Sequence, residues 1–168
     1  MTNTAIVIAR ILRREGGVAD VGDGKGITRY GQTPEWLEQF NLIPPETELQ
    51  AAVNYTRWMQ ILKLDQVCEI DLELGDGLTD FAVHSGHIPS IKALQRVVNV
   101  PADGIVGPFT LAAIRSYPKL WAVAILFECQ RWRYLGDALA SQKKDNRKYA
   151  RNWSDRSASR IESIVKRI

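Results

Sequence analysis

Three residues near the start of the 168-residue chain have the types and spacing of a group that transfers a proton. Glu15, Asp23 and Thr28 follow the pattern E-x8-D-x5-T. We expect Glu15 at the C-terminal end of a helix, where the helix dipole and partial burial both favour a protonated carboxyl. A protonated carboxyl can act as a general acid on a leaving oxygen, while an ionised Asp23 and the Thr28 hydroxyl position a water. The pattern is therefore typical of acid-catalysed cleavage of a sugar linkage.

Two local elements are expected to position these side chains. Residues 3–14 repeat apolar side chains at helical spacing after Thr4, the expected N-cap, and the glycines at 16–17 end the helix. Glu15 then lies in the last turn. Residues 18–32 are rich in Gly and Asp but include β-formers, which predicts a small hairpin.

The rest of the chain predicts helices. A short helix opens at Thr33-Pro34, another ends near Ser85-Gly86, and a third begins near Gly107-Pro108. Residues 119–139 are apolar nearly all round in their first half, so we expect this helix to be central. Two further helices are expected to pack through apolar stripes, made of Leu49, Ala52, Val53, Trp58 and Met59 in one and of Trp153, Ile161, Ile164 and Val165 in the other. The predicted fold class is mainly α, with one small β-hairpin after the first helix.

Charge is unevenly distributed along the chain. The net charge is +3, but the residues after 140 hold nine Lys and Arg against three Asp and Glu, which leaves −3 for the first 140. Such a basic tail favours an anionic partner, namely a wall polymer, lipopolysaccharide, phospholipid or nucleic acid. A solvated helical face with ion pairs explains the same charges equally well.

Several classes of protein and site are disfavoured. No apolar run approaches the length of a membrane span, and the AIVIA segment is too short for the core of a signal peptide, so we expect a soluble chain without an export signal. Cys68 and Cys129 are expected to be buried free thiols. His84 and His87 form an H-x-x-H pair with no third ligand, which argues against a metal site. The five Trp side chains are expected mostly in the core.

The pattern and several later segments resemble one known group of enzymes. The E-x8-D-x5-T spacing is similar to that of phage-type lysozymes, and the fuller string resembles the glycoside hydrolase family 108 N-acetylmuramidases. The matching residues of the first segment are Glu15, Gly16, Gly17, Asp23, Gly26, Thr28, Tyr30 and Gly31. The TDFAVHSG segment also resembles the family, as does IKALQRVVNVPADGIVGPFTLAAI, which is similar to its peptidoglycan-binding segment.

This resemblance implies a lysozyme-like α+β fold in a single domain, residues 1–168. Residues 1–86 would form the catalytic part, and residues 87–168 a helical, peptidoglycan-binding-like part packed on it. The implied activity is that of an endolysin-type muramidase, which hydrolyses the β-1,4 bond between N-acetylmuramic acid and N-acetylglucosamine. Glu15 would be the general acid, and no metal or organic cofactor is expected.

The resemblance also implies further site residues and partners. Asp23 and Thr28 would assist Glu15, and Tyr30, His84 and Ser85 would contact the substrate. His84 stands where the family has Asn, which affects substrate contacts more than the role of Glu15. We expect a monomer that binds peptidoglycan, with an anionic outer-membrane surface as a second partner of the basic tail and no nucleic acid.

Two alternatives remain at this point. A lytic transglycosylase cleaves the same bond with the acid alone, and a non-catalytic peptidoglycan-binding virion protein could keep the fold. As an endolysin, the protein would wait in the host cytoplasm and act in the periplasm or cell wall.

Overall fold

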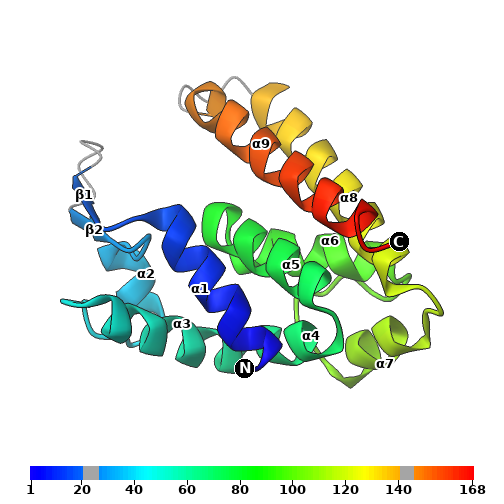
Figure 1. The fold of residues 1–168 in the computed structure, drawn as a ribbon, viewed down its shortest axis with the longest axis horizontal. Helices are drawn as coiled ribbons and strands as arrows, with labels where there is room; N and C mark the ends of the chain where they lie inside the picture. Colours follow the sequence, from blue (N-terminus) through cyan, green and yellow to red (C-terminus); the bar gives the residue numbers. More distant parts are fainter. Residues whose placement is uncertain (21–26, 141–145) are drawn as a thin grey trace.

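The computed structural model describes residues 1–20, 27–140 and 146–168 of the chain. In these ranges two short strands follow the first helix, and the other elements are helical (Figure 1). The elements are α1 (Asn3–Glu15), β1 (Val18–Asp20), β2 (Ile27–Arg29), α2 (Pro34–Gln39), α3 (Glu48–Leu62), α4 (Leu64–Ile70), α5 (Leu72–Ser85), α6 (His87–Val97), α7 (Pro108–Ser116), α8 (Leu120–Ala140) and α9 (Asn146–Val165). The predicted fold class, mainly α with a hairpin after the first helix, is confirmed.

Helix α1 ends as the sequence predicted, but it begins with a different cap. Glu15 is its last residue, and the N–H of Gly16 donates to the carbonyl of Leu12 at 3.2 Å. At the other end the side chain of Thr2, not Thr4, accepts the N–H of the first turn. The Thr4 hydroxyl instead donates to Glu69 of α4 at 2.6 Å, which ties α1 to α4.

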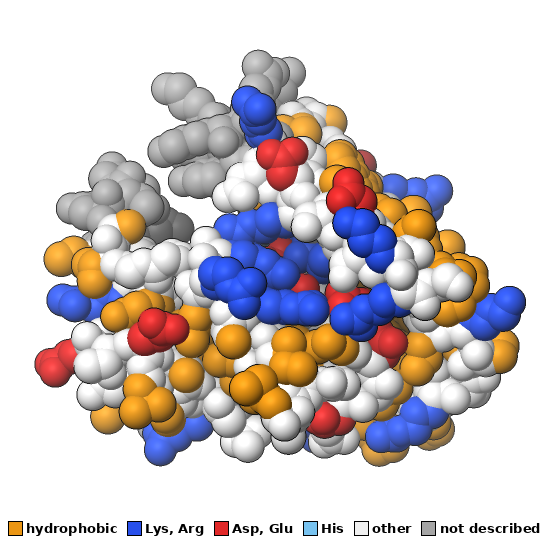
Figure 2. All heavy atoms as spheres, in the orientation of Figure 1, with side chains coloured by type: hydrophobic (Ala, Val, Ile, Leu, Met, Phe, Trp, Pro, Cys, Tyr) orange, Lys and Arg blue, Asp and Glu red, His pale blue; other side chains and the backbone are white. Residues whose placement is uncertain are grey.

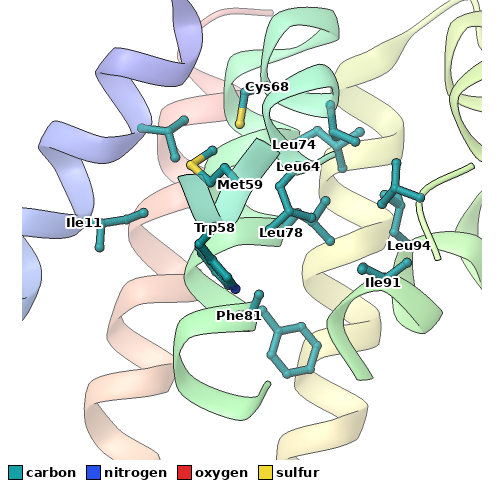
Figure 3. Packing of buried hydrophobic residues seen from close by; sticks show 14 of the residues in the cluster. Ile11, Trp58, Met59, Leu64, Cys68, Leu74, Leu78, Phe81, Ile91 and Leu94 are labelled. Atoms are coloured by element: carbon teal, nitrogen blue, oxygen red, sulfur yellow. The ribbon is translucent and has the colours of Figure 1, made fainter. Parts of the chain in front are cut away.

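Helix α5 is the centre of the fold. All of its residues from 73 to 82 are buried, and α1, α4, α6, α8 and α9 pack around it. Figure 3 shows Leu74, Leu78 and Phe81 of α5 among apolar side chains from the surrounding helices. The expectation that residues 119–139 form the central helix is therefore wrong: α8 exposes 38 % of Trp121 and 51 % of Leu126. The apolar sequence predicted the length of this helix correctly, but it did not predict how much of the helix surface is exposed.

The predicted packing face of α3 is also displaced. Ala51, Tyr55, Trp58 and Met59 are buried, whereas Leu49 is exposed over 75 % of its surface. Val53 and Ala52 lie at the edge of the packed face or outside it. On the observed face, Asn54 and Tyr55 donate hydrogen bonds to Gln32 and Tyr30 in the segment after β2.

Helix α9 packs through arginine and serine as well as through apolar side chains. Ser157, Arg160 and Ile164 are buried, while Val165 of the predicted face is 56 % exposed. Arg156 is also largely covered. Some arginines of the basic tail are therefore neutralised inside the protein. Neither a solvated helical face nor a surface for an anionic partner accounts for all the charges of the tail.

Three smaller expectations have mixed outcomes. Both cysteines are free, but only Cys68 is buried, and Cys129 is exposed. Trp58 is a core residue, whereas Trp121 and Trp132 are partly exposed. Among the described helices, none combines the length and the apolar character that crossing a membrane requires.

Candidate active site

A cavity of about 270 Å³ lies at the C-terminal end of α1. Glu15 of α1 lines it together with Thr28 and Gly31 of the hairpin segment. The opposite side is formed by Val83 and His84 of α5 and by Asn152, Trp153 and Arg156 of α9. We call it the Glu15 cavity. Two members of the E-x8-D-x5-T pattern therefore meet at one site.

The turn after β2 holds the hairpin against Glu15. Tyr30 and Gly31 both have positive φ angles, 52° and 76°, and Arg29 and Gln32 exchange backbone hydrogen bonds across them. These are the angles of a tight two-residue hairpin turn, in which glycine is favoured. A Cβ atom on Gly31 would lie 2.7 Å from Cγ of Glu15, so this position also needs glycine for space.

The same turn is anchored on α3. The hydroxyl of Tyr55 donates to the carbonyl of Tyr30 at 2.8 Å, and the buried Gln32 side chain donates to the carbonyl of Ala51 at 2.9 Å. Asn54 donates to Gln32 at 2.8 Å. These three bonds hold the turn that follows Thr28 against α3.

Glu15 is paired with an arginine from the far end of the chain. Its Oε1 accepts a hydrogen bond from Nη1 of Arg156 at 2.8 Å, and the Glu15 side chain is 16 % exposed. Arg156 also donates to Asp80 of α5 at 3.1 Å and to the side chain of Asn152 at 3.1 Å. Arg156 therefore bridges Glu15 of α1 and Asp80 of α5 from the last helix.

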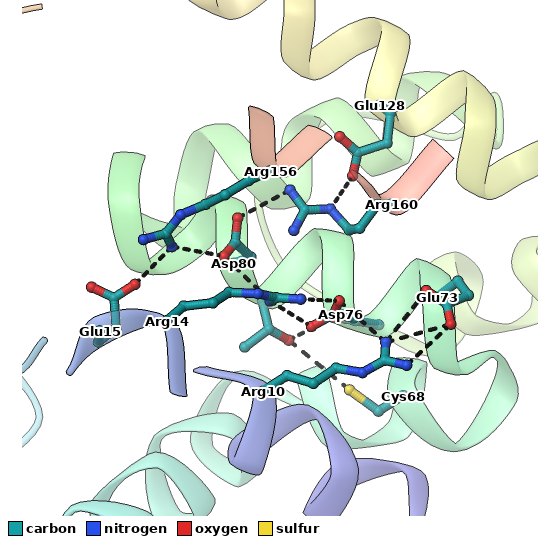
Figure 4. A network of polar contacts seen from close by, with 12 residues as sticks. Arg10, Arg14, Glu15, Cys68, Glu73, Asp76, Asp80, Glu128, Arg156 and Arg160 are labelled. Carbon is teal, nitrogen blue, oxygen red and sulfur yellow. Dashed lines mark hydrogen bonds and ion pairs between the residues drawn. The ribbon is translucent and has the colours of Figure 1, made fainter. Parts of the chain in front are cut away.

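A band of ion pairs continues from Glu15 into the protein (Figure 4). It joins the α5 acids Glu73, Asp76 and Asp80, and Glu128 of α8, to arginines of α1, α8 and α9, namely Arg10, Arg14, Arg131, Arg156 and Arg160. Burial alone would raise the pKa of Asp80, but the charges of Arg160, His84, Arg14 and Arg156 lower it instead. The network therefore holds Asp80 as a carboxylate beneath the cavity.

His84 lies beside Glu15 but is not its main partner. Its Nε2 is 3.6 Å from Oε1 of Glu15, and burial lowers the pKa of His84 although Asp80 and Glu15 oppose the shift. The neutral imidazole is thus favoured near neutral pH.

A metal ion fits this group poorly. Donor atoms of Glu15, Asp80 and His84 lie within 4.8 Å of one another, a spacing that could suit a metal ion. However, Arg156 donates to both carboxylates, so a guanidinium already supplies the positive charge there. The chemistry of the site is that of a carboxyl group beside arginine, in a cavity open to solvent.

The other predicted site residues have different outcomes. Tyr30 and Ser85 do not line the Glu15 cavity, and Tyr30 instead packs against the core through its partly buried ring. His84 does line it. Asp23 lies outside the described residues.

Sequence reasoning missed the contribution of α9. Arg156, Asn152 and Trp153 complete the cavity, yet the tail was interpreted only as a charged surface and an apolar packing face. A usable signal was present, because Arg156 and Arg160 recur at four-residue spacing with the buried Ile164, which places all three on one helical face.

One of three comparisons with known proteins supports a link to peptidoglycan. Residues 89–158 match a family model described as "Predicted Peptidoglycan domain", which supports peptidoglycan as a partner. A comparison with curated proteins finds no match. The fold is similar to a solved structure described as "Structure of Brucella abortus SagA", with a TM-score of 0.70 and 24 % sequence identity over 97 % of this chain and 94 % of that one.

Proposed function

We propose that the protein is a muramidase that hydrolyses the β-1,4 bond between N-acetylmuramic acid and N-acetylglucosamine in bacterial peptidoglycan. One observation carries the proposal: Glu15 and Thr28, two members of the E-x8-D-x5-T pattern, line the same cavity although they lie on different elements. The match of residues 89–158 to a peptidoglycan domain supports the substrate. The bacterial cell wall is then the place of action.

Glu15 acts as the general acid in this mechanism. It gives a proton to the glycosidic oxygen, while Thr28 and Asp23 hold a water or stabilise the positive charge that develops on the sugar. Before this step the Arg156–Glu15 contact must loosen, because Arg156 occupies Oε1, an oxygen that could otherwise face the glycosidic bond. Arg156 has a second acceptor in Asp80 at 3.1 Å, so it can remain paired when substrate enters.

The test compares Glu15→Gln with wild type on purified peptidoglycan. Glutamine keeps the size of the side chain and its hydrogen-bond acceptor but has no carboxyl proton. We expect muropeptide release to fall by at least about 100-fold, the lower range for loss of a general acid. Glu38→Gln, at an exposed position on α2, is the matched control and should retain wild-type activity.

The reaction products distinguish a muramidase from a lytic transglycosylase. Hydrolysis leaves reducing ends, whereas a lytic transglycosylase leaves 1,6-anhydro ends, and mass spectrometry distinguishes them. Full activity of Glu15→Gln would overturn the role of Glu15 in either reading.

One observation favours a second candidate, a non-catalytic peptidoglycan-binding protein with this fold. The Arg156–Glu15 ion pair occupies the carboxylate that catalysis needs. In that case wild-type protein would bind purified peptidoglycan in a pull-down and release no muropeptides.

A further inference from the structure

A second cavity, also of about 270 Å³, lies between α1 and α9 next to the Glu15 cavity. Arg10, Arg13 and Arg14 of α1 line it opposite Arg160 of α9, and Glu73 and Asp76 of α5 complete it. We call it the arginine groove. Arg14 directly precedes Glu15, and Arg160 is one helical turn beyond Arg156, so the groove continues from the candidate active site along the same two helices.

The exposed part of the groove is positively charged. Its two acids are buried, with Asp76 0 % and Glu73 5 % exposed, whereas Arg10 and Arg14 above them retain 22 % and 23 %. Arg13 is exposed and makes no ion pair within the described ranges. Figure 2 shows the resulting band of Lys and Arg side chains across the middle of this face, in the region between α1 and α9.

One buried guanidinium in the groove keeps a donor without a partner. Arg160 is 3 % exposed and bonds to Glu128 and Asp80, yet its Nη1 has no hydrogen-bond acceptor among the described residues. A buried donor without an acceptor is costly, so such an atom calls for an explanation. A bound anion would supply the missing acceptor.

We infer that the arginine groove binds the free carboxylates of the peptide stem that muramic acid carries. This inference rests on the proposed substrate, peptidoglycan. The stem is attached to one of the two sugars at the cleaved bond, so it leaves the glycan close to Glu15, where the groove begins. Arginine binds carboxylates through paired, charge-assisted hydrogen bonds, and four arginines line this path.

The test measures binding of free stem peptide, released from purified peptidoglycan by an amidase, without any turnover. We expect wild type to bind the peptide and Arg13→Glu to bind it at least ten-fold more weakly. Arg13 is exposed and unpaired, so the substitution leaves the ion-pair network intact. Ser159→Glu introduces the same charge from the exposed surface of α9 and should weaken binding in the same way.

Two controls identify the source of the effect. Arg133→Glu changes the net charge equally at an exposed position on α8 outside the groove, and it should bind like wild type. A stem peptide with its carboxylates amidated should not bind. Equal binding of the amidated peptide, unchanged binding in both groove variants, or tight competition by inorganic phosphate alone would overturn the inference.

The outcome is separable from that of the proposed function. If muropeptide release fails but stem peptide binds through Arg13, the groove is a recognition site of a non-catalytic wall protein. If hydrolysis occurs and the peptide does not bind, the muramidase proposal survives and the groove assignment is rejected.

Discussion

The guanidinium of Arg156 lies 2.8 Å from the carboxylate of Glu15, although 141 residues separate them in the chain. This contact joins the C-terminal end of α1 to α9 (Figure 4). The same guanidinium also reaches Asp80 of the central α5 at 3.1 Å, so a single side chain links three helices at the candidate active site.

Replacing Arg156 by Gln should lower the free energy of unfolding, because its guanidinium contacts both Glu15 at 2.8 Å and the buried Asp80 at 3.1 Å. A hydrogen bond to a charged group contributes about 1.5–3 kcal/mol, and we expect a loss in this range. The measurement is urea unfolding at neutral pH. Arg151→Gln is the matched control, because Arg151 is on the same helix, 92 % exposed, and pairs only weakly with Asp155 at 4.0 Å. Equal free energies of unfolding for Arg156→Gln and wild type would contradict this account of the ion pair.

Replacing Gly31 by Ala should reduce both stability and activity. The φ angle of 76° disfavours alanine by roughly 1–2 kcal/mol, and the added Cβ meets Glu15 at 2.7 Å. We expect a loss of about this size in the free energy of unfolding, with at least a ten-fold loss of muropeptide release because Glu15 is displaced. Gly17→Ala, at a hairpin position where a Cβ meets nothing within 4 Å, should change both quantities much less. A Gly31→Ala protein with wild-type activity would show that Glu15 does not need this neighbour.

Local signals in the sequence predicted the parts of the site that lie close together in the chain. The Gly-Gly stop placed Glu15 at the end of α1, and the β-formers before Tyr30 predicted the hairpin that carries Thr28. These features depend on backbone preferences of neighbouring residues. The contribution of α9 depends instead on which distant charges meet, and no local preference determines that.

The buried charges were the largest gap between sequence and structure. On α5, Glu73, Asp76 and Asp80 share one helical face, and that acidic stripe faces the arginines of α1 and α9. In the sequence, the acidic face of α5 and the arginines of α1 and α9 each resemble a solvated helical surface. Pairing with arginines of the neighbouring helices compensates the cost of burying these carboxylates.

Replacing Asp80 by Asn should strongly destabilise the fold. Asp80 is 2 % exposed and accepts hydrogen bonds from Arg131 at 2.8 Å and from Arg160 at 3.1 Å. The variant therefore removes the negative charge that faces two buried guanidinium groups. Removing one partner of a buried ion pair costs about 3–5 kcal/mol. Urea unfolding measures this loss, and Asp155→Asn, in an exposed pair, is the control with little expected change. A change in Asp80→Asn as small as that of the control would mean that the network does not hold the helices together.

The last prediction concerns the charge of His84. Burial lowers the pKa of this side chain below its ordinary value of 6.5, so the unfolded chain takes up a proton more readily than the folded protein. Stability is therefore complete above about pH 6.5 and falls as the pH decreases toward the lower, folded pKa. In wild type, the unfolding temperature should fall more between pH 7.5 and 5 than in His84→Asn.

NMR titration of the imidazole resonances tests the same point directly. The chain contains two histidines, so the His84→Asn spectrum assigns both signals by the one that disappears. We expect a midpoint below 6.5 for His84. A midpoint above 6.5 would mean that the carboxylates of Asp80 and Glu15 outweigh burial. A charged imidazolium would then lie 3.6 Å from Oε1 of Glu15, as a second cation beside Arg156.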